Sequence, residues 1–251
     1  GGAKYPRAHR PTDGSAIGPE VIRVLWKAAK DRKMDVRTQT RATEIIMKDG
    51  RVAGVKATTK DGKVYTIDAK AVVLATGGFG ANQDMLVKYQ PKLKGYATTN
   101  QPGATGDGII LAEHAGAALV DMKQIQAHPT AAPDGTLISE SVRGDGGILI
   151  NAEGKRFTNE LLTRDVVSAG ELKQPGRFAW VFWDDATRKS AKLMDSYISM
   201  GLAVKGNTVA EIAKAMNVPA AELEATLKAY AAGKAAGKDA FGRADMPQAM
   251  Q

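Results

Sequence analysis

The sequence has no cysteine among its 251 residues. Disulfide bonds and thiolate metal sites are therefore excluded, which fits an oxidising compartment without establishing one. No apolar run approaches the ~18 residues of a membrane span, and no basic start followed by an apolar core opens the chain. We therefore expect no membrane span and no signal peptide within these residues, and whether a signal peptide has been removed stays open.

Aromatic residues are also scarce, at 6% of the chain, although the formal net charge is +8. A nucleic-acid-binding surface needs clustered basic residues, commonly with aromatic side chains on which bases stack. Here the lysines are scattered through the expected helices and hairpins, as at Lys27, Lys33 and Lys228. We therefore expect no nucleic-acid partner, and the positive potential favours an anionic small molecule instead.

A length of 251 residues fits one large or two modest domains, and a hydrophobic content of 43% is ample for a packed core. The helices and strands expected along the chain predict a mixed α/β (α+β) fold. Apolar spacing predicts a helix from Pro19 to about Lys33 that packs on a sheet. Four strands should follow, and the Asp49-Gly50 and Asp61-Gly62 turns should join them into an antiparallel meander. Their expected ranges are residues 36–39, 42–47, 52–58 and 64–68.

A continuous apolar run from Ala71 to Thr76 predicts a buried strand that leads into Gly77-Gly78, where the backbone can approach a ligand closely. Asp107 should lie near the N-cap position of a helix from Ile109 to Ala117, and a cap is one explanation of it. The chain then continues as helices and short strands and ends in a polar, loop-like tail. The expected ranges are helices 82–89, 184–192, 208–215 and 218–232, strands 148–150 and 178–183, and tail 233–251.

Polar and charged residues gather around one glycine-rich loop, Gly144 to Gly147. They form a set that suits an anionic substrate and a proton, namely His128, Ser139, Glu140, Arg143 and Arg164. Glu140 and Arg143 are three apart and touch if the turn after Ser139 is helical. A proton-transfer site is one interpretation, and an ordinary ion-pair network is the other.

The same stretch predicts two local structures. After the strand 148–150, residues Asn151 to Gly154 should turn the chain so that Arg156-Phe157 pairs back along it. Thr163 should cap a helix that begins near Arg164, which would place this arginine at a helix N-terminus.

Three motifs occur here in order: His128-Pro-Thr130, then Ser-Glu-x-x-Arg-Gly-x-Gly-Gly from Ser139, then Asn-Glu-x-x-Thr-Arg-Asp ending at Asp165. They resemble the flavoprotein of soluble fumarate reductases of the flavocytochrome c type, and more distantly that of membrane-bound fumarate reductase and succinate dehydrogenase. The resemblance extends upstream to Gly1 to Thr12, Ala75-Thr-Gly-Gly-Phe79 and residues 102–108, and downstream to Val218-Pro-Ala-Ala-Glu222, so it covers nearly the whole chain.

The resemblance implies FAD as cofactor and a carbon–carbon double bond activated by carboxylates as the bond reduced, with fumarate going to succinate. It implies a proton donor, Arg164, that Glu140 and Arg143 reload from solvent. Substrate-binding residues by the same resemblance are His128, Ser139, Gln126 and Leu137. Cofactor-binding residues are Ala42, Thr76, Gly77 and Asp107, and the loop with His9 and Arg10 should lie near the flavin.

The resemblance also implies a part of a longer flavoprotein, since no strand and G-x-G-x-x-G turn for the pyrophosphate precedes Gly1. We expect a partial FAD domain at 1–124, a capping or clamp domain at 125–251, and weak or no binding of FAD by the 251 residues alone. An electron-donor protein or haem domain should serve the parent protein, in anaerobic respiration. The periplasm is the expected compartment, with the cytoplasm as the alternative.

Two other functions stay open. The substrate could be another unsaturated acid such as urocanate, acrylate, methacrylate or a cinnamate, although His128 argues for fumarate. The chain could also be a non-catalytic binding domain with inherited motifs. An absorption spectrum distinguishes the last case, since bound flavin absorbs near the visible edge.

Overall fold

A computed structural model describes residues 9, 11–13, 15–190 and 193–247. It divides into two compact units. The described part of the N-terminal unit contains residues up to 92 together with 101–123, and that of the C-terminal unit contains 93–100 and 124–247. The expected flavin-facing loop lies mostly outside the described residues, since only His9 and residues 11–12 of it are described.

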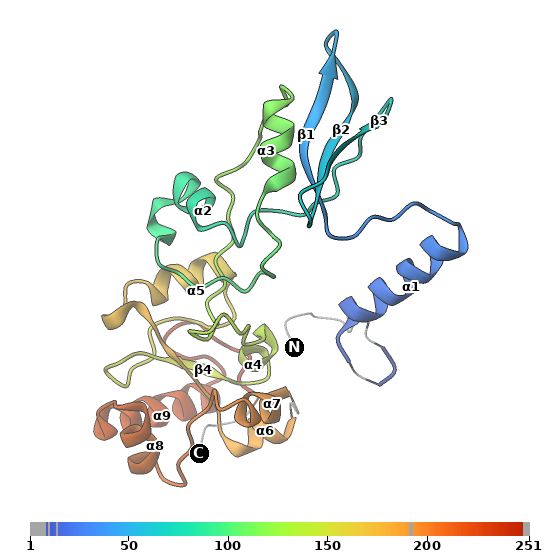
Figure 1. Cartoon of the computed structure of the whole chain (residues 1–251). Helices are drawn as coiled ribbons and strands as arrows, with labels where there is room; N and C mark the ends of the chain where they lie inside the picture. Colours follow the sequence, from blue (N-terminus) through green and yellow to red (C-terminus); the bar gives the residue numbers. More distant parts are fainter. Residues whose placement is uncertain (1–8, 10, 14, 191–192, 248–251) are drawn as a thin grey trace. The chain divides into compact units, whose positions relative to one another are not determined.

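The N-terminal unit contains the predicted meander. Strands β1 (Thr40–Lys48), β2 (Arg51–Thr59) and β3 (Val64–Asp68) form one antiparallel sheet in the order β1-β2-β3 (Figure 1). Asp49 and Gly50 both have positive φ, 50° and 73°, which is the two-residue turn that matches the twist of a hairpin. The predicted strand 36–39 is wrong, because these residues are irregular and β1 begins after them.

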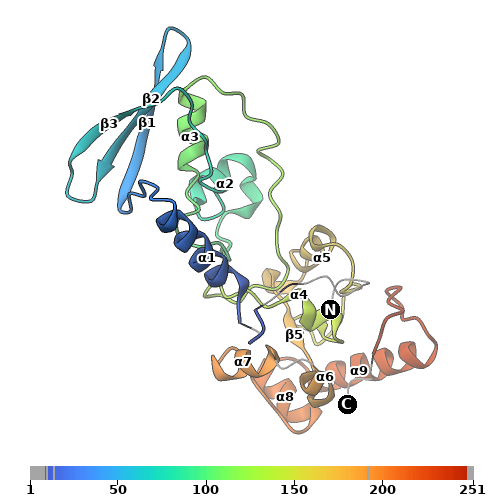
Figure 2. The same cartoon turned by 90° about the vertical axis from the view of Figure 1, so that its right-hand side faces the viewer.

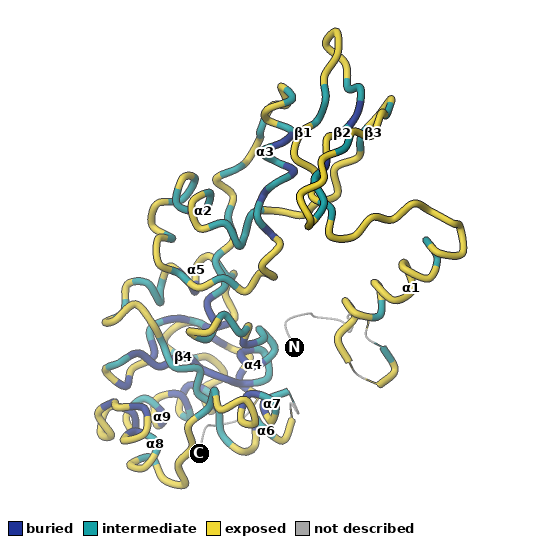
Figure 3. The backbone as a smooth tube through the Cα atoms, viewed as in Figure 1, coloured by how far each residue is buried: buried dark blue, intermediate teal, exposed yellow. Residues whose placement is uncertain are grey.

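Helix α1 (Ile17–Asp31) confirms the first predicted helix, but its predicted packing on a sheet is wrong for the described residues. None of its residues is buried, and its apolar side chains are exposed, Ile22 by 66% and Leu25 by 60% (Figure 3). The predicted strand 71–76 is also wrong. Its residues are extended without strand partners, and Val73 is 89% exposed.

These two errors have one physical reason. A central strand exists only where neighbouring strands hydrogen-bond to it, and an amphipathic helix is buried only where a sheet covers its apolar face. Among the described residues, the single three-stranded sheet of this unit is the meander, and neither segment belongs to it.

Two further helices complete the N-terminal unit. Helix α2 (Gln83–Tyr89) is capped by Asn82, whose side chain accepts from the Met85 N–H at 3.0 Å, and the short helix η1 (Pro91–Leu93) follows. Helix α3 (Asp107–His114) lies beside β1 in both views (Figures 1 and 2). It begins two residues before the predicted start, so Gly106, with φ 79°, is its N-cap and Asp107 its first residue.

The C-terminal unit has a larger core. Strand β4 (Ile148–Ile150) pairs antiparallel with β5 (Trp180–Phe182), and helices α8 (Val209–Met216) and α9 (Ala220–Ala235) pack on them. All three β4 residues are fully buried (Figure 3). The predicted cap of α8 is confirmed, since Thr208 Oγ1 accepts from the Glu211 N–H at 3.2 Å.

A second apolar cluster supports the stretch that carries the motifs. It joins Ile138 and Val142 to Met194 and Tyr197, which belong to helix α7 (Leu193–Ser199). Helix α7 was not predicted from the sequence. Helix α4 (Glu140–Gly144) supplies Val142, and helices α5 (Arg164–Glu171) and α6 (Asp185–Ser190) with the short helix η2 (Pro175–Arg177) complete the unit.

Two predictions in this unit need correction. The predicted return strand at Arg156-Phe157 is wrong, because β4 pairs with β5 instead and the Arg156 side chain forms buried ion pairs. The tail is loop-like as predicted, yet it is not a solvated surface segment, since Arg243 and Met246 are buried.

The mixed helix and strand class is confirmed. None of the described helices has the length and apolar character of a membrane span.

Candidate active site

A narrow hairpin brings His128 close to the start of α4. Thr130 and Ile138 exchange hydrogen bonds across it, with the Ile138 N–H donating to the Thr130 carbonyl at 3.0 Å and the Thr130 hydroxyl to the Ile138 carbonyl at 2.8 Å. Ala131 and Leu137 form a bridge between the two arms. The hairpin thus brings His128 close enough to the start of α4 for its ring and the Glu140 carboxylate to act on each other electrostatically.

Ser139 is the N-cap of α4. Its Oγ accepts from the Ser141 N–H at 3.3 Å and from the Ser141 hydroxyl at 3.0 Å, and its N–H donates to the Tyr197 hydroxyl at 2.9 Å. Both interactions of the Ser139 hydroxyl use its oxygen as an acceptor. Its proton therefore remains available for a ligand.

Glu140 lies between two arginines, which confirms that Glu140 and Arg143 touch within a helical turn. Its Oε1 is 3.4 Å from Arg143 Nη2, and its Oε2 is 2.9 Å from Arg164 Nη2. Hydrogen bonding from Arg164, followed by the charges of both arginines, lowers the pKa of Glu140, although partial burial opposes this. The carboxylate is therefore ionised at neutral pH and bridges the two guanidinium groups.

The two arginines have different surroundings. Arg143 is 1% exposed as a side chain, whereas Arg164 is 37% exposed and also donates from Nη1 to Gln126 Oε1 at 2.9 Å. Burial lowers the pKa of Arg143. Arg164 is the first residue of α5, as predicted, and Thr163 occupies the N-cap position without donating or accepting a capping hydrogen bond through its side chain.

His128 is a neutral hydrogen-bond donor in this geometry. Its Nδ1 accepts from the Thr130 N–H at 3.2 Å, so the neutral ring carries its proton on Nε2. Burial first, and then the charges of Arg164 and Arg143, lower the pKa of His128. The ring can therefore donate from Nε2 near neutral pH without carrying a charge.

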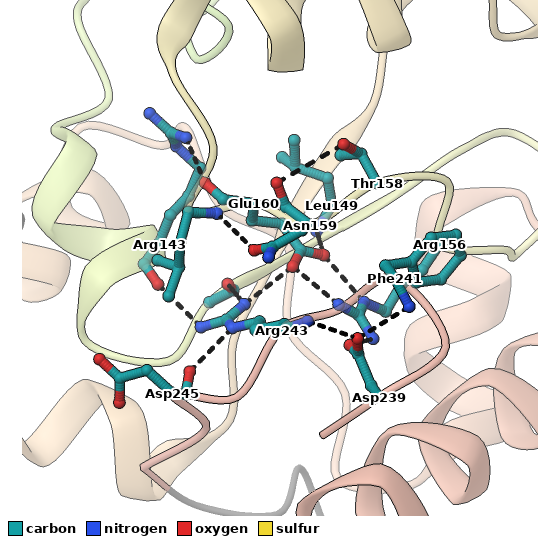
Figure 4. A network of polar contacts seen from close by, with 12 residues as sticks. Arg143, Leu149, Arg156, Thr158, Asn159, Glu160, Asp239, Phe241, Arg243 and Asp245 are labelled. Carbon is teal, nitrogen blue, oxygen red and sulfur yellow. Dashed lines mark hydrogen bonds and ion pairs between the residues drawn. The ribbon is translucent and has the colours of Figure 1, made fainter. Parts of the chain in front are cut away.

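A buried network of ion pairs and hydrogen bonds binds both the side chain and the carbonyl of Arg143 (Figure 4). Arg143 Nη1 donates to the Glu160 carbonyl at 2.6 Å, and Arg243 Nη2 donates to the Arg143 carbonyl at 3.0 Å. The Glu160 carboxylate accepts from Arg156 and from Arg243 at 2.8 and 2.9 Å, and Asp239 pairs with Arg156 at 2.6 Å. With Glu140 and Arg164 included, three carboxylates face four guanidinium groups, so the linked network has a formal charge of +1.

Glu160→Gln is expected to destabilise the protein by about 3–5 kcal/mol, because it removes the carboxylate paired with buried Arg243 and one of the two paired with Arg156. The shift of the urea midpoint measures this. The matched control is Glu153→Gln, because Glu153 is exposed in the turn after β4. This substitution should change stability by less than about 0.5 kcal/mol. Equal effects of the two substitutions would show that the network contributes nothing.

The network is the part of the site that sequence reasoning missed. Arg156 and Glu160 are four residues apart, a spacing that could have indicated a pair. Arg243 is 83 residues from Glu160 and lies in a segment that reads as a polar tail. No local pattern contains this contact.

The four residues expected to face the cofactor lie in the N-terminal unit, and three of them meet at the start of α3. The Gly106 N–H donates to the Gly78 carbonyl at 3.1 Å, and a Cβ at Gly108 would overlap the Thr76 side chain. Thr76 and Gly77 therefore lie against the first turn of α3, where Asp107 begins the helix.

Ala42 lies near the start of α3, because its neighbour Arg41 contacts Asp107. Arg41 forms an ion pair with Asp107 at 2.9 Å, and the Thr105 hydroxyl donates to the other Asp107 oxygen at 2.8 Å. Ala42 is the next residue of β1, beside an irregularity in the pairing with β2. The four residues thus gather on one side of the N-terminal unit.

This cluster has the features of a surface for a phosphate-containing ligand. Thr76, Gly77 and Gly78 are exposed, and Gly77 has a positive φ of 75°. Among the described residues, the N–H groups of Gly77 and Gly78 donate no hydrogen bond, so both remain available. Free backbone N–H groups at a glycine turn are suited to phosphate. The described residues hold no cluster of His, Asp or Glu fit for a metal ion.

Comparison with known proteins agrees with these features. Residues 1–249 match the model of the FAD binding domain family. The chain is 44% identical over its full length to a fumarate reductase (cytochrome) of Shewanella frigidimarina and covers 44% of that protein. It is 42% identical to an NADH:fumarate oxidoreductase of Klebsiella pneumoniae over 92% of this chain and 25% of that one.

A solved structure also matches. The open conformation of a flavocytochrome c3 fumarate reductase superposes with a TM-score of 0.83 at 44% identity, over all of this chain and 45% of that one. The chain thus spans less than half the length of each of these three proteins.

Proposed function

Because this chain belongs to the FAD binding domain family, we propose that the protein containing it uses FAD to reduce the carbon–carbon double bond of an unsaturated carboxylate, with fumarate going to succinate. The observation that carries the proposal is the Glu140 carboxylate between buried Arg143 and partly exposed Arg164. The Glu140 carboxylate connects the guanidinium of Arg143, which is shielded from solvent, to that of Arg164, which can reach a substrate.

The N-terminal unit has residues that fit FAD. Thr76 and Gly77 offer a hydroxyl and backbone N–H groups, Asp107 offers a carboxylate at the first turn of α3, and Ala42 offers backbone at the β1 irregularity. When bound, FAD supplies the hydride for the double bond. We propose that residues 1–124 are part of the FAD domain and that residues 125–251 form a capping domain.

The substrate carboxylates need neutralisation so that negative charge can accumulate on carbon. We assign this role to the Nε2–H of His128 and the hydroxyl proton of Ser139, both of which lack another acceptor among the described residues. Gln126 orients Arg164 through the 2.9 Å hydrogen bond, and Leu137, 45% exposed, can line the substrate pocket.

Arg164 is the proposed proton donor. An arginine is normally a poor acid, with a pKa above about 12, but the carbon that has received hydride is a far stronger base. The guanidinium also places positive charge beside that carbon before the proton moves. Glu140 then takes a proton from Arg143 and returns it to Arg164, and burial favours this by lowering the pKa of Arg143.

Fumarate is expected to reoxidise the photoreduced flavin of the full-length protein faster than urocanate or methacrylate does. The reason is that paired carboxylates match the several positive and donating groups gathered around His128 and Arg164. Anaerobic stopped-flow absorption measures the three rates. A reversed order would assign the protein to another acid.

Reduction of another unsaturated acid is the second candidate, since more distant relatives are named as NADH:acrylate oxidoreductase and urocanate reductase. The substrate order above separates the two. A non-catalytic binding domain predicts no flavin spectrum in the full-length protein. We also propose that an electron-donor protein or a haem domain serves the full-length protein, since the Shewanella relative is named as a cytochrome. We propose a periplasmic location as well.

A further inference from the structure

Helix α5 carries a carboxylic acid, Glu171, on the same side as Arg164. Glu171 is the last residue of this helix, seven positions after Arg164, and seven residues are about two turns of an α-helix. Val167 and Ser168 lie between them at the spacings of one helix face and are both buried. Glu171 therefore belongs to the side of α5 that faces the interior of the C-terminal unit.

The surroundings of Glu171 tie it to Arg143. The two side chains act on each other electrostatically, although they come from different helices, α4 and α5. Among the described residues, Arg143 is the charged group that acts on Glu171, and the segment before β5 contributes only the Ala179 N–H. Burial raises the pKa of Glu171 to about 7, against the smaller opposing effects of that N–H and of Arg143.

Two buried polar atoms in the same region lack partners. In the described part of the chain, neither Arg143 Nε nor Ser168 Oγ makes a hydrogen bond, although Arg143 is 1% and Ser168 6% exposed. Buried polar atoms without partners are rare, and each one needs an explanation. A proton route through Arg143 explains its unpartnered Nε, because a member of such a route must be able to change partners.

We propose that Glu171 supplies protons to Arg143 and so forms the solvent end of the relay that continues through Glu140 to Arg164. This inference rests on the proposed reduction of an unsaturated acid. Glu171 is partly exposed, so it can exchange protons with water, whereas Arg143 cannot. It is a residue that acts through Arg143 and does not touch the substrate.

The proton balance is simple. For each product molecule, Arg164 gives one proton to carbon and regains one from Arg143 through Glu140. The protonated Glu171 carboxyl then gives its proton to Arg143, and the resulting carboxylate takes one from water. One proton enters for each one consumed, and the electron pair comes with the hydride.

The test is the pH profile of Glu171→Gln in the full-length protein. We expect kcat for fumarate at pH 6 to 7 to fall about tenfold, well below the 10²–10⁴-fold that a direct general acid contributes. The deficit should shrink above pH 8, where wild-type Glu171 is ionised, and KM should stay within about twofold. Glu171→Asp should restore part of the rate, and Glu153→Gln on the exposed turn should behave as wild type.

A readout without turnover follows from the pKa of Glu171, which is raised from 4.5 to about 7 by folding. An acid whose pKa rises on folding stabilises fully below its unfolded pKa and loses this contribution as pH rises through the folded value. The melting temperature of wild type relative to Glu171→Gln should therefore fall between about pH 4.5 and 8.

The outcomes separate the two proposals. If wild type reduces fumarate but Glu171→Gln lowers kcat by the same factor at every pH, the role is structural and this inference is wrong. If the melting difference does not change with pH, Glu171 does not titrate as required and the inference also fails. If wild type does not reduce fumarate while the melting difference titrates, the proposed function fails and takes the relay with it.

Discussion

Replacing Arg164 by alanine in the full-length protein is expected to abolish fumarate reduction, with kcat lowered by at least about 10⁴-fold, the upper range for a general acid. The substitution removes both the proton donor and the positive charge beside the developing carbanion. Arg164 lies in the C-terminal unit, whereas Thr76, Gly77 and Asp107 lie in the other unit, so FAD content and flavin reduction should be unchanged. Dye-linked turnover and the flavin spectrum measure the two effects.

Arg164→Lys is the informative companion. An ammonium can donate a proton, but it is shorter and lacks the planar fork that binds Glu140 through Nη2 and Nε at 2.9 and 3.3 Å and Gln126 through Nη1. A small fraction of the wild-type rate should therefore remain. Near-normal turnover of Arg164→Ala would contradict the assignment, and the acid would then have to be sought at His128 or outside these residues.

Replacing Glu140 by glutamine should lower kcat by about 10²–10³-fold while the KM for fumarate changes little. Glutamine keeps the size of the side chain and can still contact both arginines, but it cannot take a proton from Arg143 and pass it on. The relay is thus interrupted while substrate binding is retained.

The matched control is Glu222→Gln, which removes an exposed carboxylate paired with Lys155 at 3.6 Å and should leave turnover unchanged. A Glu140→Gln variant that kept kcat but raised KM would assign Glu140 to substrate binding. A variant that lost FAD would make its effect structural.

Local chemistry explains which parts of the site could be predicted from the sequence. The contact between Glu140 and Arg143 follows from their spacing of three, and α5 begins at Arg164 as expected. The Asp49-Gly50 turn follows from residues that accept positive φ. In each case one short segment contains the whole cause, so the sequence alone was sufficient.

The remaining features depend on distant parts of the chain. Arg243 is buried because Glu160 and the Gly147 carbonyl accept its hydrogen bonds, and both lie more than eighty residues before it. The same limit explains the strand predicted at 71–76 and the packing predicted for α1, since both need a sheet that the described residues do not provide. Asp107 follows the N-cap of α3, near the cap position as expected, but its contacts with Arg41 and Thr105 were not predicted.

The most direct test of the central claim is a single-turnover experiment on the full-length protein. The flavin is photoreduced without oxygen, one equivalent of fumarate is added, and absorption and product are followed together. We predict that oxidised flavin returns with one succinate per flavin in wild type, and that Arg164→Ala stays reduced although it binds fumarate. Wild-type flavin that stayed reduced, or Arg164→Ala flavin that was reoxidised as fast as wild type, would contradict the account.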